Sequence, residues 1–171
     1  MTSTAPRLPA PGAMSALAGG DLTIRPAHPE EAAALSALAF RSKAYWGYDA
    51  AFMEACRADL TVSSEEIARR PVYVLEGAEL LLGFYTLRGD GDEATLTDLF
   101  LDPAAIGRGH GRRLWQHAVE TARRLGCATL VLHSEPQAEG FYRAMGAVRV
   151  GDVPSNVFPG RMLPLMRIRL A

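Results

Sequence analysis

The segment 99–126 carries the residues whose types and spacing point most directly to chemistry. A hydrophobic run ends at Asp102, and glycines then alternate with other residues at Gly107, Gly109 and Gly111, ahead of a long amphipathic stretch. This order predicts a strand, a glycine-rich turn and a helix. Unpaired N–H groups at the start of a helix, together with its partial positive charge, form a binding site for a phosphate or pyrophosphate.

Three arginines add full positive charges to this turn, namely Arg108, Arg112 and Arg113. A Walker P-loop would need Lys-Ser/Thr after the last glycine, and a dinucleotide-binding fingerprint would need a further glycine in place of Arg112. Neither pattern is present. The alternative to a phosphate site is a glycine-rich loop that only makes a tight connection between strand and helix.

Two motifs in this chain resemble those of the GNAT superfamily of N-acetyltransferases. Residues 106–114, IGRGHGRRL, resemble its acyl-CoA motif Arg/Gln-x-x-Gly-x-Gly/Ala, and residues 138–147, AEGFYRAMGA, resemble its segment A-x-x-F-Y-x-x-x-G-F. The resemblance covers about residues 22–170. Three positions depart from the pattern: Ile106 replaces the usual Arg or Gln, Glu135 stands where many members have Asn, and Ala147 where many have Phe.

The resemblance implies an α/β (α+β) fold with a mixed, mostly antiparallel sheet of six to seven strands and about four flanking helices. Its two central parallel strands would splay apart, with the acyl chain between them. The implied activity is transfer of an acetyl group from acetyl-CoA to a primary amine by direct attack. The implied cofactor-binding residues are Leu99, Phe100, Leu101, Gly107, Arg108, Gly109, His110, Gly111, Arg112, Glu135, Ala138, Phe141 and Tyr142.

Tyr142 is the candidate general acid. In the family the matching tyrosine lies near the sulfur of CoA and can protonate it, and a positioned acid contributes typically about 10²–10⁴-fold. The alternative is a packing tyrosine whose hydroxyl has an ordinary hydrogen-bond partner.

Three residues are candidates for the base that takes a proton from the amine: Asp98, His133 and Glu135. Asp98 interrupts an apolar and threonine-rich strand, and a carboxylate on a central strand needs a partner or a task. In a regular strand Thr95 and Thr97 would face one side and Asp98 the other. A β-bulge, which the family strand often carries, would change that. His133 ends the next strand and has an ordinary pKa near 6.5, which suits a base.

Other segments are expected to form the acceptor site. Residues 41–48, RSKAYWGY, are aromatic and basic, and the family places this region over the acceptor. Trp46 and Tyr48 would form an apolar or cation-binding wall, and Arg161 would bind a carboxylate of the acceptor in bidentate fashion. Thr97 is a further residue expected to bind the acceptor. Packing between helices, and an ordinary surface arginine, are the alternatives.

Composition limits the remaining possibilities. The chain of 171 residues suits one domain, over 21–171, with 1–20 as a flexible Ala/Pro/Gly/Ser-rich tail. A net charge of −1 gives no support for a nucleic-acid or membrane partner. Cys56 and Cys127 lack metal-ligand spacing, so we expect no metal site but buried thiols in a reducing, cytoplasmic setting. No signal peptide is evident. We expect a monomer or homodimer.

The hydrophobic pattern predicts the elements that must position these residues. Strands are expected at 21–25, 72–75, 80–87, 95–101, 129–133, 148–150 and 162–170. Helices are expected at 29–41, 50–60, 109–125 and 137–145, with a further short helix that begins at residue 63. Residues 89–92, Gly-Asp-Gly-Asp, are expected to form a turn.

Two further functions remain open at this point. One is a CoA-binding sensor or regulatory domain of the same fold without catalysis, which would lack a working base and acid. The other, less favoured because Lys-Ser/Thr is missing, is a nucleotide-binding protein. The acceptor itself is open between a small-molecule amine, an amino acid and a protein amine.

Overall fold

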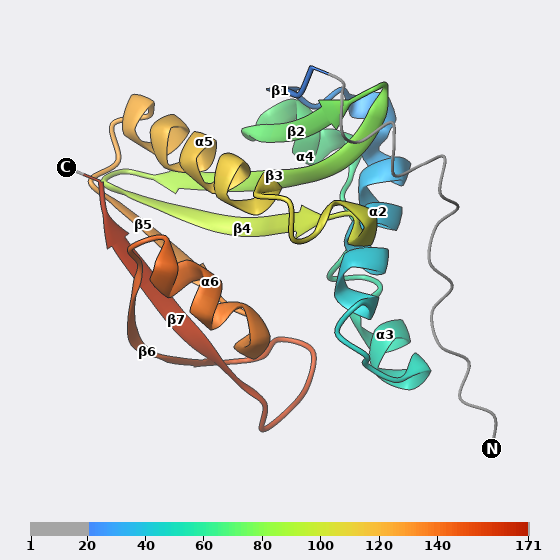
Figure 1. The fold of residues 1–171 in the computed structure, drawn as a ribbon. Coiled ribbons are helices and arrows are strands. Elements are labelled where there is room, and N and C mark those ends of the chain that lie inside the picture. Colours follow the sequence, from blue (N-terminus) through green and yellow to red (C-terminus); the bar gives the residue numbers. More distant parts are fainter. Residues whose placement is uncertain (1–20, 171) are drawn as a thin grey trace.

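The computed structural model describes residues 21–170, so the expected tail at 1–20 lies outside the described residues. A seven-stranded mixed sheet has the order β1-β2-β3-β4-β5-β7-β6, with only β4 and β5 parallel (Figure 1). The strands are β1 (Thr23–Pro26), β2 (Val72–Gly77), β3 (Leu80–Asp90), β4 (Glu93–Leu101), β5 (Thr129–His133), β6 (Val148–Pro154) and β7 (Met162–Arg169). The α/β fold expected from the sequence is confirmed.

The described residues also form five α-helices and three short 3-10 helices. They are η1 (Pro29–Glu31), α2 (Ala32–Ala44), α3 (Ala50–Cys56), α4 (Ser64–Arg69), η2 (Pro103–Ala105), α5 (His110–Arg124), η3 (Pro136–Ala138) and α6 (Glu139–Ala144). Two apolar cores lie on the two faces of the sheet. One packs α5 and α6 against residues such as Leu87 and Leu130, and the other packs α2, α3 and α4 against Val74 and Phe84.

Several expected boundaries were wrong by a few residues, among them a turn and the end of a helix. The turn expected over 89–92 is shorter, because β3 continues through Asp90 and only Gly91 and Asp92 join it to β4. Gly91 has φ +63°, which glycine adopts without strain, so a two-residue hairpin turn suffices. The helix expected over 50–60 ends at Cys56, after which the chain continues in turns.

The parallel pairing of β4 with β5 is short. It runs from Glu93 opposite Thr129 to Leu96 opposite Leu132, whereas β4 itself continues to Leu101. The two strands therefore separate beyond Leu96, and that stretch of β4 pairs only with β3. This is the opening between central strands that the family resemblance implied.

A β-bulge in β4 decides which way its side chains face. Asp98 pairs with Thr86 and Leu96 with Leu87, so Thr97 is an extra residue on β4. Before the bulge, Leu96 lies in the core under α5. After it, Leu99 packs against that same core and Phe100 against the opposite one. Because neighbouring side chains of a strand face opposite sides, Asp98 faces the side covered by α2 and Leu99 the side covered by α5. Without the bulge, Asp98 would face the side covered by α5.

A polar network sits between the sheet and α5 on the other face. The Tyr85 hydroxyl lies 2.7 Å from His117 Nδ1 and 3.0 Å from Thr121 Oγ1, and Arg124 donates to the same Thr121 oxygen over 3.0 Å. A neutral His117 with an unprotonated Nδ1 can accept the phenol proton of Tyr85. Burial, and then the charge of Arg124, lowers the pKa of His117.

Candidate functional site

The glycine turn leads into α5 through backbone conformations that only glycine adopts readily. Gly107 has φ +79° and Gly109, the N-cap of α5, has φ +82°. No heavy atom lies within 4 Å of a Cβ built at either position, so the turn faces open space. The N–H of Arg113 bonds to the carbonyl of Gly109 over 3.2 Å and begins the helical ladder. The preceding N–H groups of α5 are therefore free to bind a ligand.

His110 lies at the start of α5 beside these amides. Its side chain is 6% exposed, and its Nε2 makes no hydrogen bond with any part of the chain that the structure describes. Burial, and then the charges of Arg108 and Arg113, lowers its pKa and keeps the imidazole neutral. The three arginines differ: Arg113 donates to the carbonyl of Leu22 over 2.7 Å, whereas Arg108 and Arg112 are exposed beside the turn.

The fold brings the other expected cofactor residues to this turn. A Cβ on Gly111 would lie 3.4 Å from the Phe141 ring and 3.5 Å from Leu101, so the start of α5 touches both β4 and α6. Ala138 and Leu99 pack in the same core. Two expected cofactor residues lie elsewhere. Phe100 is on the opposite face of the sheet, 5.8 Å from the Phe84 ring, and Glu135 binds Lys43, Tyr48 and Arg161.

Tyr142 lies in α6 and is 7% exposed. Its ring packs edge-on against Trp115 at 5.5 Å and Phe141 at 5.1 Å, and its hydroxyl has no hydrogen-bond partner among residues 21–170. Burial raises the pKa of Tyr142, and the negative charges of Asp98 and Glu135 raise it further. The phenol is thus held in the protonated form that a general acid requires.

Asp98 is half-buried in β4 and accepts a hydrogen bond of 3.2 Å from Thr97. Burial raises its pKa to about 6, against the opposing effect of the Thr86 and Thr97 hydroxyls. A carboxyl with this pKa is ionised at neutral pH yet is a stronger base than an ordinary aspartate. His133, the second candidate base, is exposed at the end of β5 and makes no side-chain hydrogen bond within the described chain.

Glu135, the third candidate, is occupied by a cluster of donors from three other segments. Its Oε1 pairs with Lys43 Nζ, and its Oε2 accepts from the Tyr48 hydroxyl over 2.6 Å and from Arg161 Nη2 over 2.9 Å. Burial pushes the pKa of Glu135 upward, but these bonds outweigh it and hold the pKa below its ordinary value. The geometry makes Glu135 a permanent anion rather than a proton acceptor.

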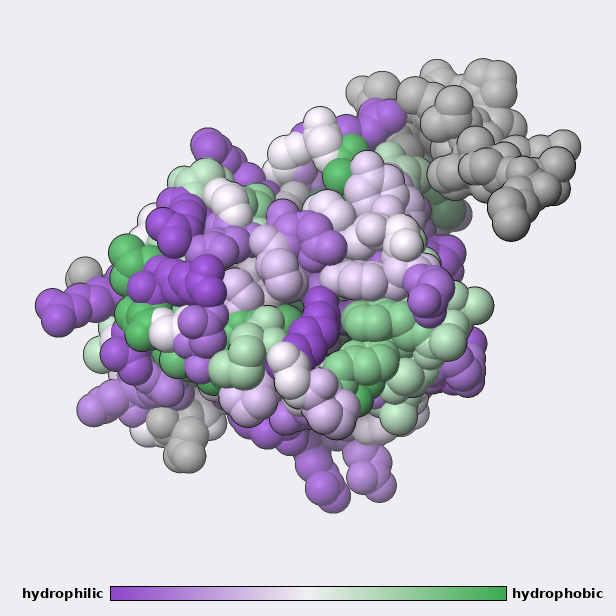
Figure 2. Space-filling view, turned by 90° about the horizontal axis from the view of Figure 1, so that it is seen from below, coloured by the Kyte–Doolittle hydropathy of each residue, from purple (hydrophilic) through white to green (hydrophobic). Residues whose placement is uncertain are grey.

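An aromatic stack supports this cluster. The rings of Tyr48 and Phe52 lie 4.1 Å apart and those of Phe52 and Phe158 lie 4.3 Å apart, both nearly parallel. The Arg161 guanidinium lies 5.5 Å from the Tyr48 ring and 5.2 Å from the Phe52 ring, and Lys43 Nζ lies 5.7 Å from both. Figure 2 views the molecule from below, with a hydrophobic patch beside hydrophilic residues on the side where α3 lies in Figure 1.

The sequence predicted some members of this cluster and not others. Tyr48 and Arg161 are brought together as expected, with an Arg161–Tyr48 hydrogen bond of 2.9 Å. Trp46 is 41% exposed and packs edge-on against Tyr45, outside the stack. Thr97 is exposed, and its hydroxyl lies within hydrogen-bond distance of both the Thr86 carbonyl and the Asp98 carboxylate. Lys43, Phe52 and Phe158 were missed. The one available signal was that Lys43 follows Leu35 and Ala39 at intervals of four residues, which places a lysine in line with apolar residues of the same helix.

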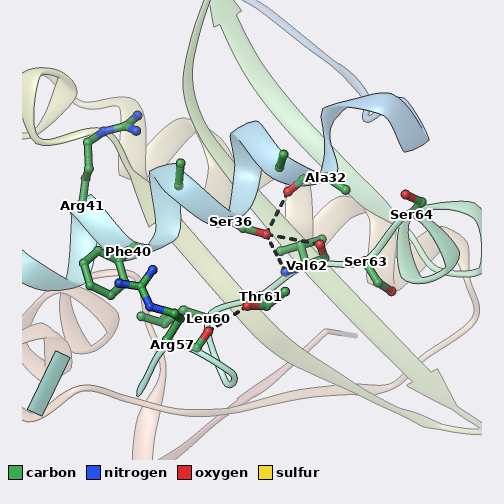
Figure 3. A pocket seen from close by; sticks show the side chains of 12 residues that line it. Ala32, Ser36, Phe40, Arg41, Arg57, Leu60, Thr61, Val62, Ser63 and Ser64 are labelled. Atoms are coloured by element: carbon green, nitrogen blue, oxygen red, sulfur yellow. Dashed lines mark hydrogen bonds between the residues drawn. The ribbon is translucent and has the colours of Figure 1, made fainter. Parts of the chain in front are cut away.

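A separate cavity of about 750 Å³ lies between α2 and the segment 57–64 (Figure 3). In it the Arg57 guanidinium lies 4.4 Å from the Phe40 ring, and Ser36 Oγ bonds to both the N–H and the carbonyl of Val62. None of the residues of the glycine turn, nor Asp98 or Tyr142, lines it. It therefore contributes nothing to the site described above.

Within residues 21–170 no group of three or more His, Cys, Asp or Glu side chains is placed to hold a metal ion. Within the same residues no helix is long and apolar enough to cross a membrane. Cys56 and Cys127 are both free and buried.

Comparison with known proteins agrees with this geometry. A family model described as "Acetyltransferase (GNAT) family" matches residues 37–147, which is more than half of the chain. A probable glucosamine 6-phosphate N-acetyltransferase 2 of Oryza sativa subsp. japonica is 31% identical over 105 residues, covering 57% of this chain and 63% of that protein. The chain thus matches less than two thirds of this relative.

Solved structures share the fold at lower sequence identity. The PaiA N-acetyltransferase of Thermoplasma acidophilum, solved with coenzyme A, has a TM-score of 0.69 at 20% identity, covering 87% of this chain and 99% of that one. A GCN5-related N-acetyltransferase of Rhodopseudomonas palustris has a TM-score of 0.71 at 22% identity, covering 86% and 94%. Because the family model matches more than half of this chain, the chain belongs to the acetyltransferase (GNAT) family.

Proposed function

We propose that this protein is an acetyl-CoA-dependent N-acetyltransferase that acts on a primary amine by direct attack. The observation that carries the proposal is that β4 leaves β5 beyond Leu96, so that Asp98 lies on the unpaired stretch of β4 and its charge acts on the buried Tyr142. The open glycine turn lies at the start of α5, which touches the end of the same strand at Leu101. Family membership and the relatives named as N-acetyltransferases support the same activity.

The residues around the turn fit coenzyme A. The open space at Gly107 and Gly109, the free amides at the start of α5 and the unpartnered Nε2 of His110 suit a pyrophosphate, with Arg108 and Arg112 as nearby cations. Leu99, Leu101, Ala138 and Phe141 would line the opening between β4 and β5. Bound acetyl-CoA supplies the activated acetyl group, and the PaiA structure was solved with coenzyme A.

Asp98 and Tyr142 would handle the protons. An alkylamine has an ordinary pKa of about 10.4 and is mostly protonated at neutral pH, so it must lose a proton before it attacks. Asp98 would take that proton, directly or through water, and the Tyr142 hydroxyl would donate one to the departing sulfur. Opposite environments favour opposite roles here, because the carboxyl is ionised near pH 7 while the phenol is not.

We extend the proposal to the setting of the enzyme. The two free, buried cysteines suit the reducing cytoplasm, and residues 21–171 would form a single catalytic domain. The acceptor would be a small-molecule amine or a protein amine.

A thiol-release assay with acetyl-CoA and a broad panel of primary amines tests the activity. We expect amine-dependent release of CoA that falls sharply in Asp98→Asn and Tyr142→Phe. Tight binding of CoA without release for any amine would favour the sensor or regulatory function instead.

A further inference from the structure

We propose that Lys43 and Arg161 form a receptor for an oxyanion of the acceptor, so that the preferred acceptors are primary amines carrying a carboxylate or a phosphate. The inference rests on the proposed function, because it concerns the acceptor of the same reaction. It rests on the composition of the Glu135 cluster, meaning Lys43, Tyr48, Glu135 and Arg161.

The cluster holds more positive charge and more donors than it can satisfy internally. Lys43 and Arg161 face a single carboxylate, that of Glu135, in the ion pairs of the described chain. Arg161 uses only Nη2 in the hydrogen bonds within residues 21–170, which leaves Nε and Nη1 of its planar fork. Such a fork matches the geometry of a carboxylate or phosphate.

Burial makes this surplus costly for the free protein. Lys43 is 9% exposed, and the Arg161 side chain is 21% exposed, so bulk water hydrates neither fully. A buried lysine and a partly buried arginine beside one anion leave a positive charge without a partner, and a ligand oxyanion would neutralise it. An acceptor without an anionic group would not neutralise this positive charge, and its affinity would not benefit from Lys43 or Arg161.

Contacts with neighbouring residues hold Arg161 of the receptor in a defined position. Arg161 is presented by the β6–β7 loop, in which the Ser155 N–H bonds to the Arg161 carbonyl over 2.7 Å and the Arg161 N–H to the Phe158 carbonyl over 3.2 Å. Ser155 Oγ accepts from the N–H groups of Val157 and Phe158. The rings of Tyr48 and Phe52 then restrict the guanidinium from the side, which preserves its orientation for a bidentate contact.

The receptor also lies close to the reacting groups. Glu135 is the N-cap of η3, and η3 leads directly into α6 with Tyr142. The Glu135 charge acts on Tyr142, as does that of Asp98. A small acceptor bound through its oxyanion at Arg161 would therefore present its amine near these groups, which gives the orientation that rapid transfer requires.

Matched pairs of acceptors test the inference. We would measure kcat/KM by thiol release at saturating acetyl-CoA for L-leucine against L-leucinamide and for glucosamine 6-phosphate against glucosamine. The oxyanion member of at least one pair should be preferred by about 10- to 100-fold, the range of a charge-assisted hydrogen-bonded pair. The pair that shows the preference distinguishes carboxylate from phosphate.

Substitutions at Lys43 and Arg161 test whether these residues cause the preference for the oxyanion acceptor. Lys43→Met, Arg161→Ala and Arg161→Lys should lose it mainly through the KM of the oxyanion acceptor, with the KM of acetyl-CoA unchanged. Arg161→Lys keeps a cation but loses the fork, so it remains informative if the alanine variant does not fold. The matched control is Arg57→Ala, since Arg57 also stacks on an aromatic ring and pairs with a glutamate, but lies outside the cluster.

Sulfate gives a readout that does not require turnover. With CoA present to occupy the glycine turn, sulfate should raise the unfolding temperature of the wild type and of Arg57→Ala, and should do so much less in Lys43→Met and Arg161→Lys. In Glu135→Gln the sulfate effect should be stronger, because the competing internal carboxylate is gone.

The outcomes separate the two proposals. Equal kcat/KM within both pairs would overturn the oxyanion receptor and leave the acetyltransferase in place. Absence of thiol release with every amine would overturn the acetyltransferase, and the sulfate series would then decide the receptor. A sulfate effect that is absent, or equal in all variants, refutes it.

Discussion

Replacing Asp98 with asparagine should slow the enzyme and, at neutral pH, stabilise the fold. The carboxyl has a pKa of about 6 in the fold against an ordinary value of 3.8, chiefly because the fold removes water from around it. The folded state therefore binds more protons than the unfolded state between pH 4 and pH 6. The free energy of unfolding then falls as the pH rises through this window.

The size of the effect follows from the two pKa values. Each pKa unit corresponds to about 1.4 kcal/mol, so ionising Asp98 in the fold costs up to about 3 kcal/mol of stability above pH 6. Asparagine carries no charge and avoids that cost. Relative to the wild type, Asp98→Asn should gain up to about 3 kcal/mol between pH 4 and pH 8, measured by urea unfolding at each pH.

Activity should change in the opposite direction. Loss of the base should lower kcat/KM by about 10²–10⁴-fold on the plateau near pH 8. The ratio of wild-type to Asp98→Asn kcat/KM cancels the ionisation of the amine, and it should fall about tenfold from the plateau to pH 5 because the wild-type carboxyl is then protonated. A ratio independent of pH, together with unchanged relative stability, would refute the reasoning on both counts.

Three further predictions follow from other parts of the structure. Tyr142→Phe should lower turnover by about 10–10³-fold with little change in CoA affinity, since the hydroxyl acts as charge develops on sulfur; full activity in single-turnover experiments would leave Tyr142 a packing residue. Gly109→Asp should abolish CoA binding in a calorimetric titration while the protein stays folded, because a carboxylate would repel the pyrophosphate and strain a φ of +82°. The lowered pKa of His117 means that the unfolded state binds the proton more readily, so its contribution to stability is present above about pH 6.5 and is lost as the pH falls below that value. His117→Gln should flatten this part of the stability curve, and an identical curve in wild type and variant would argue against a lowered pKa of His117 in the fold.

The parts of the fold and site that could be predicted are those that local sequence specifies. The glycine turn was predictable because positive φ at Gly107 and Gly109 is a local requirement, and β5 was placed at its observed bounds by its short apolar run. Tyr142 was found through a contiguous motif. Its burial and its contact with Trp115 agree with the expected packing as well as with the proposed role.

The remaining features depend on contacts between distant segments. The facing of Asp98 follows from a bulge that exists only in the register of β4 against β3, so strand alternation alone gave the wrong side. Lys43 lies in the last turn of α2, where a basic residue is favoured by the helix dipole, and nothing nearby in sequence indicates its partner Glu135. Phe158 and Phe52 meet only because the β6–β7 loop folds over α3.

The bulge at Thr97 also makes packing and chemistry inseparable within one strand. A single inserted residue shifts the phase of β4, so that its first half and its last residues both supply side chains to the core under α5 while Asp98 is directed to the other layer. Deleting that residue would swing Leu99 and Leu101 out of one core and turn the carboxyl away from its present surroundings in the same step. Loss of the bulge would therefore disturb both layers at once, whereas a substitution at Asp98 would leave the register of β4 against β3 unchanged.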